Sequence, residues 1–267
     1  MIATIARQTR RVVRRMTGGR FSEADFARAQ FAGRRAGTML DVGAHYGESH
    51  RWYLRQGWKV VAFEPDPANR ARIGRSAAPD RLHVHDCAIS DREVHAAEYF
   101  ASDESTGISA LAPFVPSHKP VCRVQVRTLG ALFQERRFDS CDFLKIDTEG
   151  HDLFVLRGFP WEAVRPDVIL CEFEDRKTVP LGYDYRVLGD FLREKGYTVF
   201  LSEWAPITRY GVEHTWRRLV RYPAPLLDDR GWGNFVALRD DRPLSPPAER
   251  WLEQTLRRCA SPAALSS

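Results

Sequence analysis

Several ionisable side chains follow one another in residues 143–152 (FLKIDTEGHD). The segment begins as an apolar run, and charged groups beside a buried strand are costly unless they are paired or used in chemistry. Asp147 comes at the carboxyl end of this run, so we expect it to take a proton from a substrate. His151 is the second candidate base because of its natural pKa. Lys145 and Glu149 complete the predicted catalytic set.

An ion pair of Lys145 with Asp147 or with Glu172 is the structural interpretation of the same residues. Glu172 lies near the end of another apolar run, residues 168–173 (VILCEF), and is a candidate to line a pocket and contact the substrate. Asp147, Glu149 and Glu172 offer oxygen ligands for a hard cation, but their spacing matches no diagnostic metal signature. We therefore predict no metal ligand, and a divalent metal that activates the substrate stays an unsupported alternative.

A second group lies in residues 41–48 (DVGAHYGE), where Gly43 and Gly47 bracket a tight strand-to-helix turn that a ligand can approach closely. The pattern is not the G-x-G-x-x-G fingerprint, and its acids are unfavourable for a pyrophosphate. S-adenosylmethionine carries an ammonium and a sulfonium, which acids can hold. A glycine turn capped by an acid is the structural alternative. The predicted cofactor contacts of this turn are Asp41, Gly43, Ala44, His45, Gly47 and Glu48.

Two more acids follow the next apolar runs. Glu64 ends the run VVAFE, and an acid at this place can accept both hydroxyls of a ribose, in NAD as well as in S-adenosylmethionine. Asp86 lies near the end of the third run, where a polar side chain would meet the adenine amine. Together they predict a nucleoside cofactor without choosing between these two.

Short apolar runs alternate with helical stretches from Thr38 onward. The predicted strands are residues 38–44, 60–64, 82–89, 142–147, 168–173, 197–201 and 234–238, and the predicted helices are 48–56, 67–76, 151–157 and 185–195. This alternation predicts an α/β fold with a mostly parallel sheet covered by helices on both faces. Ligands of such folds bind at the carboxyl ends of the strands, which is where the candidate residues lie.

Two insertions interrupt the alternation. Residues 93–126 contain two expected antiparallel strands, 94–100 and 121–126, around a polar loop, 102–109. Residues 202–232 are irregular, and their segment 209–222 mixes aromatic residues with Arg. We interpret that segment as a solvated amphipathic helix, with an acceptor-binding cap or a nucleic-acid contact as alternatives. The candidate substrate contacts in it are His214, Trp216 and Arg217.

The net charge of +5 is concentrated at the front of the chain. Residues 1–37 hold nine Arg and two acids, so the remainder is slightly acidic and a nucleic-acid partner is disfavoured. Residues 2–16 have roughly helical apolar spacing, and contact with an anionic membrane is the alternative to a frayed basic helix. The chain shows no apolar run of membrane-spanning length and no secretory signal, so we expect a cytoplasmic protein, although the Arg-rich start is also similar to a transit peptide.

These features divide the chain into three parts. Residues 1–37 form a basic N-terminal segment, residues 38–240 a single α/β domain with both insertions, and residues 241–267 a C-terminal helix and tail.

The segments DVGAHYGES, FEPDP, FLKIDTEGHDLFVLRG and ILCEFED, in this order and spacing, resemble the FkbM-type family of S-adenosylmethionine-dependent methyltransferases. The resemblance covers roughly residues 39–238, and its most specific part is K-I-D-x-E-G followed by the V-L-x-G helix. It implies a class I methyltransferase sheet of seven strands with the last one antiparallel. It also implies methylation of a hydroxyl on a saccharide, glycolipid or natural product. His45 stands where the family pattern more often has Asn.

By this motif match, the resemblance implies cofactor contacts at Asp41, Gly43, Gly47 and Glu64. It also implies a polar pocket that consists of Lys145, Asp147, Glu149 and Glu172. The first rival function is an NAD(P)-dependent oxidoreductase, although the dinucleotide fingerprint and a Tyr-x-x-x-Lys pair are missing. The second is a domain that binds a nucleoside without catalysis. An RNA methyltransferase comes third because the body of the chain is not basic.

Overall fold

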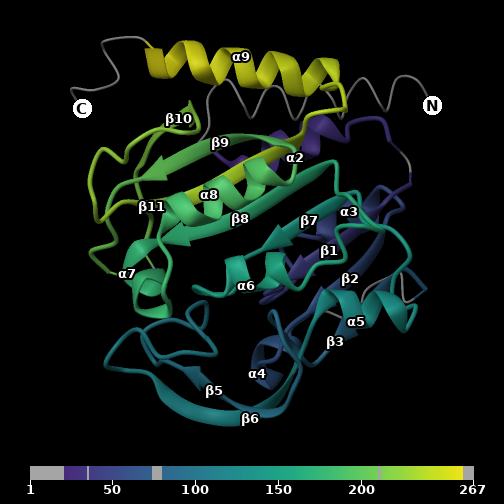
Figure 1. Cartoon of the computed structure of the whole chain (residues 1–267), viewed down its shortest axis with the longest axis vertical. Helices are drawn as coiled ribbons and strands as arrows, with labels where there is room; N and C mark the ends of the chain where they lie inside the picture. The colour runs from purple at the N-terminus through teal and green to yellow at the C-terminus, as the bar shows by residue number, and fades with distance from the viewer. Residues whose placement is uncertain (1–20, 35, 74–79, 210–211, 261–267) are drawn as a thin grey trace.

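The computed structural model describes residues 21–34, 36–73, 80–209 and 212–260 (Figure 1). The helix predicted over residues 2–16, with its membrane contact, lies outside the described residues. In chain order the elements are α2 (Glu23–Gln30), β1 (Thr38–Val42), α3 (Arg51–Arg55), β2 (Lys59–Phe63), α4 (Pro67–Arg70), β3 (Leu82–His85), β4 (Ala88–Ile89), β5 (Val94–Ala101), β6 (Lys119–Arg127), α5 (Leu129–Gln134), β7 (Phe143–Ile146), α6 (Asp152–Arg157), β8 (Val168–Glu174), α7 (Asp175–Thr178), η1 (Val179–Leu181), α8 (Tyr185–Glu194), β9 (Tyr197–Trp204), β10 (Trp216–Arg221), β11 (Trp232–Arg239) and α9 (Pro246–Ala260).

The main sheet has the strand order β10-β9-β11-β8-β7-β1-β2-β3 (Figure 1). Neighbouring strands from β8 through β3 pair in parallel, whereas β11 is antiparallel to both β8 and β9. The predicted α/β fold with a parallel core and an antiparallel last strand is therefore confirmed. The described sheet has eight strands and not the seven that the resemblance implied, because β10 adds an antiparallel strand at its edge.

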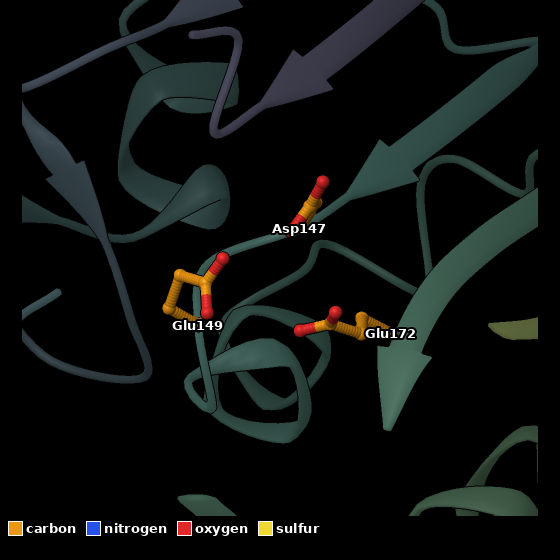
Figure 2. A group of neighbouring side chains, drawn as sticks. All are labelled: Asp147, Glu149 and Glu172. Carbon is orange, nitrogen blue, oxygen red and sulfur yellow. The ribbon is translucent and has the colours of Figure 1, made fainter. Parts of the chain in front are cut away.

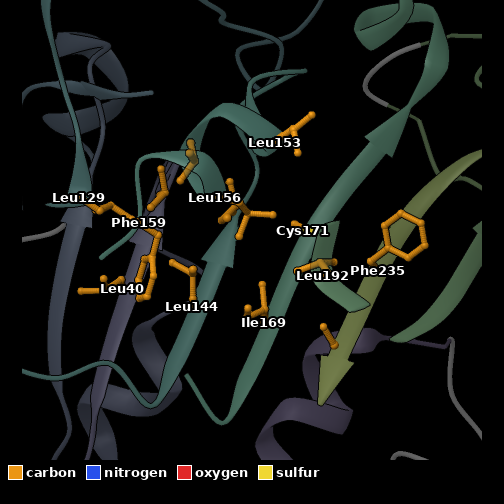
Figure 3. Close-up of a cluster of buried hydrophobic side chains, with 14 of the residues drawn as sticks. Leu40, Leu129, Leu144, Leu153, Leu156, Phe159, Ile169, Cys171, Leu192 and Phe235 are labelled. Carbon is orange, nitrogen blue, oxygen red and sulfur yellow. The ribbon is translucent and has the colours of Figure 1, made fainter. Parts of the chain in front are cut away.

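Alternating side chains of the central strands feed two cores on opposite faces of the sheet. Leu40, Leu144 and Ile169 of β1, β7 and β8 face α6 and α8 (Figure 3). Met39 and Phe143, each one residue earlier on its strand, pack with the residues of α2, α3 and α9 on the other face. Strands buried on both faces read as continuous apolar runs, which is why the sequence shows them so clearly.

The first insertion forms the predicted antiparallel pair, β5 and β6. The run at residues 82–89, predicted as one strand, splits into β3 in the main sheet and β4, which pairs with β6. This small sheet has a core of its own around Ala88, Tyr99, Val124 and Val126, at the end of the molecule opposite α9 (Figure 1).

The amphipathic helix predicted within residues 209–222 is wrong, because Trp216–Arg221 forms strand β10 against β9. Trp216 stacks on Phe21 with ring centroids 3.9 Å apart, and Leu219 is buried in the same core. The isolated segment has helix-like charge spacing, but pairing with β9 and burial of these side chains decide its conformation.

The first described helix, α2, lies beside α9 and the β10 edge of the sheet (Figure 1). Its buried Glu23 accepts hydrogen bonds from Ser202 Oγ (2.6 Å) and Trp204 Nε1 (2.8 Å) of β9. The described part of the segment 1–37 is thus packed onto the α/β domain. Among the described residues, no helix has the length and hydrophobicity needed to cross a membrane.

Candidate functional site

A cavity opens at the carboxyl ends of β1, β2 and β7, where the sequence placed the site. It encloses about 710 Å³ of empty space, part of which is open to solvent. Of the predicted site residues, the cavity is lined by Gly43, His45, Glu64, Asp147, Glu149 and His151. The predicted residues that are not part of its lining are Asp41, Ala44, Gly47, Glu48, Asp86, Lys145, Glu172, His214, Trp216 and Arg217.

Asp41 lies behind the cavity in a buried ionic network. Its fully buried carboxylate accepts hydrogen bonds from Ser49 Oγ (2.6 Å) and His50 Nδ1 (2.7 Å), and Lys145 Nζ lies 3.5 Å away. Burial alone would raise the pKa of Asp41, but Lys145, His50 and Ser49 together lower it. In this structure Asp41 stabilises the turn that follows β1.

Gly43 lets the ends of β1 and β7 approach each other closely. Its φ is +75°, and a Cβ there would lie 1.8 Å from the carbonyl oxygen of Asp147. Lys145 Nζ donates to the Gly43 carbonyl (2.6 Å), and this hydrogen bond also holds the ends of the two strands together. Gly47, with φ +76°, has the His50 ring where its Cβ would be. Of the other residues in this turn, Ala44 is buried and Glu48 is exposed.

Glu64 presents a carboxylate at the end of β2, and it lines the cavity. Its Oε2 accepts from the His45 backbone N–H (2.7 Å), and its Oε1 accepts from the Asp66 N–H (3.0 Å). Burial raises the pKa of Glu64 to about 7, although these two N–H groups act in the opposite direction. Each carboxylate oxygen can accept a second hydrogen bond, so the residue can still hold two hydroxyls.

The loop 102–109 of the first insertion covers the cavity. Thr106 Oγ1 accepts from Tyr46 OH (2.8 Å) and lies 3.1 Å from His45 Nε2. Asn69 Nδ2 donates to the Thr106 carbonyl (3.1 Å). His45, which stands where the family more often has Asn, thus joins the turn after β1 to the roof of the cavity.

One side of the cavity is an apolar wall that includes strand β4. Phe63, Cys87, Ala88 and Ile89 line this part, whereas the neighbouring Asp86 is exposed and not part of the lining. Such a wall suits the faces of an aromatic base. Asp86, predicted to contact the adenine, does not line the cavity, whereas the apolar residues that follow it do.

Asp147 and Lys145 form the ion pair that was the structural alternative for them. Lys145 Nζ lies 3.5 Å from Asp147 Oδ2, and the Asp147 side chain is 46 % exposed at the cavity. The expected alternative partner of Lys145, Glu172, pairs with Lys177 instead. Asp152 fixes the following turn, because its buried carboxylate accepts from Thr148 and from the backbone N–H of Glu172.

Three carboxylates face the same space between β7 and β8, those of Asp147, Glu149 and Glu172 (Figure 2). Each offers an oxygen within 4.8 Å of the others, an arrangement that could hold a hard cation. The ammonium of Lys177 already lies 2.6 Å from Glu149 and 2.9 Å from Glu172, so the chain itself supplies positive charge at this place. Burial raises the pKa of Glu149 to about 7 and also raises the pKa of Glu172, and Lys177 opposes both shifts.

His151 lines the cavity from the start of α6. Burial lowers its pKa to about 4, so the imidazole is neutral at pH 7. Its buried Nδ1 has no hydrogen-bond partner among the described residues. A neutral ring nitrogen in this situation can accept a hydrogen bond from a ligand.

The three candidate residues of the second insertion lie apart from the cavity lining. Trp216 is turned toward Phe21, and its Nε1 donates to Ser202 Oγ (3.0 Å). His214 packs edge-on against Trp232 at 5.2 Å between centroids. Arg217 is half-buried on strand β10.

Sequence reasoning missed Lys177, Asp152 and Thr106. A signal for Lys177 was present, since Glu172 and Glu174 alternate on one strand and Lys177 follows three residues later. Thr106 lies in the predicted polar loop, but nothing in the residue pattern shows that this loop folds over the cavity.

Comparison with known proteins gives one family match. The model of the Methyltransferase FkbM domain matches residues 41–199, more than half of the chain. No curated protein sequence matches.

Three solved structures illustrate the structural similarity. A TehB-like SAM-dependent methyltransferase from Corynebacterium glutamicum is 12 % identical, with a TM-score of 0.40 over 90 % of this chain and 100 % of that chain. TehB from Haemophilus influenzae is 8 % identical, with a TM-score of 0.44 over 82 % and 62 % of the two chains. The C-terminal domain of precorrin-6Y C5,15-methyltransferase from Rhodobacter capsulatus is 14 % identical, with a TM-score of 0.41 over 83 % and 92 %.

Proposed function

This chain belongs to the FkbM family and is a SAM-dependent methyltransferase, and on that premise we propose that it methylates a hydroxyl oxygen of a saccharide, glycolipid or natural product. The observation that carries this proposal is the carboxylate of Glu149, which lines the cavity with its pKa raised to about 7. A neutral hydroxyl must lose its proton as it attacks, and a base titrating near neutral pH suits that task. The family assignment decides against an NAD(P)-dependent oxidoreductase.

The lining of the cavity is suited to S-adenosylmethionine. Glu64 would accept the ribose hydroxyls, and the wall formed by Phe63 and Ile89 would pack against the adenine. The half-exposed carboxylate of Asp147 would attract the cationic part of the cofactor. When bound, the cofactor supplies a methyl group on a sulfonium, and its transfer to oxygen breaks the carbon–sulfur bond to leave a neutral thioether.

We assign the proton transfer to Glu149. Its carboxylate takes the hydroxyl proton while the oxygen forms its bond to carbon, and the protonated acid later returns the proton to solvent. Asp147, the base expected first, is more exposed to solvent than the buried Glu149, and we assign it an electrostatic role. His151, the second expectation, is neutral and can accept a hydrogen bond that orients the ligand.

The acceptor and the location of the protein stay predictions from the sequence. His214 beside Trp232 is an aromatic surface on which a sugar ring could stack. Trp216 and Arg217 have less support as acceptor contacts, because Trp216 is engaged with Phe21.

The proposal is tested in two steps. Calorimetric titration with S-adenosylhomocysteine should show binding, and NAD should show none. Transfer of labelled methyl groups is then screened across polysaccharide, glycolipid and small-molecule extracts, and the labelled product should resist mild base, as an ether does and an ester does not. Labelling of nitrogen, sulfur or carboxylate groups alone would contradict hydroxyl methylation.

Glu149→Gln is the variant that tests the proton acceptor. We expect kcat to fall about 10²–10⁴-fold, as for the loss of a general base, while the affinity for S-adenosylhomocysteine changes only a few-fold. Asp147→Asn should lower the affinity for the cofactor, and its kcat should fall less than that of Glu149→Gln. A larger loss of the single-turnover rate in Asp147→Asn than in Glu149→Gln would instead assign the role of the base to Asp147.

A further inference from the structure

We propose that Lys177 is a positioning residue of this reaction, whose buried ammonium binds Glu149, Glu172 and Glu174 and holds Glu149 at the cavity as the proton acceptor. The inference rests on the proposed function, because it concerns how the base of that reaction is kept in place. Lys177 itself is not part of the cavity lining, so it acts through Glu149.

The geometry of Lys177 is that of the centre of an ionic cluster. Its side chain is 2 % exposed, and its Nζ lies 2.6 Å from Glu149, 2.9 Å from Glu172 and 2.8 Å from Glu174. Glu149 follows β7, Glu172 and Glu174 end β8, and Lys177 is on α7. One ammonium therefore contacts carboxylates at the ends of the neighbouring strands β7 and β8.

The backbone at Glu149 needs this support. Glu149 has φ +56° and Gly150 has φ +102°, two left-handed residues in succession, and the first carries a side chain. Such a conformation persists where the surroundings hold it. The Tyr183 hydroxyl donates to the Gly150 carbonyl (2.8 Å), and the Cβ of Lys177 lies 3.2 Å from where a Cβ on Gly150 would be. Lys177 thus contacts the loop through both its stem and its charge.

Charge balance explains why the ammonium matters for proton transfer. Asp147, Glu172 and Glu174 favour the protonated form of Glu149, as does burial, and Lys177 opposes them. Arg176 pairs with Glu174 on the outer side at 3.2 Å. Tyr99 faces the cluster from β5, and burial keeps its hydroxyl protonated by raising its pKa. Lys177 is therefore the buried cation that keeps Glu149 ionised near neutral pH.

Two variants should shift the pH profile in opposite directions. Lys177→Met removes the cation, so the acid limb of kcat/KM should move up by about one to three pH units. Glu174→Gln removes a repelling carboxylate that is outside the cavity lining, so the acid limb should move down. Lys177→Arg keeps the charge and should restore most of kcat. In the variants whose acid limb shifts, we expect kcat to change while the KM for the acceptor stays within a few-fold of the wild-type value.

The matched control is Lys59→Met, at the exposed amino end of β2, which should leave the profile unchanged. Unshifted acid limbs in Lys177→Met and Glu174→Gln, in an active wild-type enzyme, would overturn the inference. If Lys177→Met does not fold, the Glu174→Gln variant decides alone. The inference is then contradicted if the acid limb of Glu174→Gln does not move to lower pH. A wild-type enzyme that methylates no hydroxyl contradicts the proposed function instead, which separates the two failures.

Discussion

Asp41 and Glu64 end neighbouring parallel strands, and the same type of side chain serves two tasks there. Asp41 is enclosed by Ser49, His50 and Lys145, which favour its charged form and fix the turn after β1. Glu64 faces the cavity, and among the described residues its carboxylate has backbone N–H groups as hydrogen-bond partners, so burial dominates and its pKa rises to about 7. The environment of each carboxylate therefore decides whether it supports the turn or is available to a ligand.

The pKa of Glu64 leads to a prediction for cofactor binding. The carboxylate must be ionised to accept two ribose hydroxyls, so the affinity for S-adenosylhomocysteine should weaken as the pH falls below about 7. The limiting slope is about tenfold per pH unit for one proton. Calorimetric titrations between pH 6 and pH 8 measure this dependence.

Glu64→Gln is the control for that titration. It should weaken binding by about tenfold to a hundredfold at pH 8, as for the loss of hydrogen bonds to a charged group, and remove most of the pH dependence. A wild-type affinity that is constant across this range would contradict the role of Glu64 as the ribose acceptor.

At the scale of single residues, the sequence predicted the ends of the strands better than the partners of each side chain. Glu64, Asp147, Glu149 and His151 line the cavity, and all four lie at or after strand ends that follow from the apolar runs. The burial of Asp41 could not be predicted, because its partner His50 becomes a neighbour only once the turn has formed.

At the scale of secondary structure, the site depends on how closely the chain after β1 approaches the chain after β7 at Gly43. The carbonyl of Asp147 occupies the place of the missing Cβ, and Lys145 bonds the Gly43 carbonyl from β7. The positions of Asp147 and of the turn after β1 are therefore coupled through this close backbone contact.

Gly43→Ala should separate these two elements. We expect a loss of about 2–5 kcal/mol in the free energy of unfolding, from the left-handed φ together with the overlap at 1.8 Å. Chemical denaturation followed by circular dichroism measures it, and binding of S-adenosylhomocysteine should fall in parallel.

Gly107→Ala is the matched stability control, since its Cβ would meet Ser105 Oγ at an ordinary 3.5 Å. A Gly43→Ala protein as stable as Gly107→Ala would show that the two strand ends can move apart without cost.

The predicted strands and helices were right where a strand is buried on both faces of the sheet. They were wrong where pairing with a distant strand overrides the residue pattern of the segment itself. The core strands β1, β2, β7 and β8 are predominantly apolar and contribute to the cores on both faces of the sheet. Strand β10 carries Arg217, Arg218 and Arg221 between its apolar residues, and an edge strand with one solvated side is easily taken for an amphipathic helix. Its partner β9 and the ring of Phe21 are distant in the sequence, so no local signal identifies it.

At the scale of the whole molecule, the two ends of the described chain pack together on the face away from the carboxylate cluster. Trp251 of α9 contacts Phe21 and Phe26, with ring centroids 5.3 and 5.1 Å apart. Glu23 connects the same region to β9. This arrangement joins the first and last described helices to one edge of the sheet.

Trp251→Ala should destabilise the protein by about 3–5 kcal/mol, because the side chain is 6 % exposed and leaves a large cavity. Its effect on S-adenosylhomocysteine affinity should stay within a few-fold under conditions where the protein is folded. Thermal and urea unfolding measure the first effect, and calorimetry measures the second.

The exposed Gln254→Ala on the same helix is the control and should stay within about 0.5 kcal/mol of the wild type. Equal stabilities of the two variants would mean that α9 adds little to the fold.

The small sheet of β4, β5 and β6 has a further consequence for how such an enzyme can diversify. It carries the loop with Thr106 that covers the cavity, but its core around Tyr99 and Val124 is separate from the two cores of the main sheet. Selection can therefore rebuild the roof of the active site while the strands that carry Glu64 and Glu149 stay unchanged. Residues 102–109 are therefore the segment in which to exchange loops when the enzyme is redesigned.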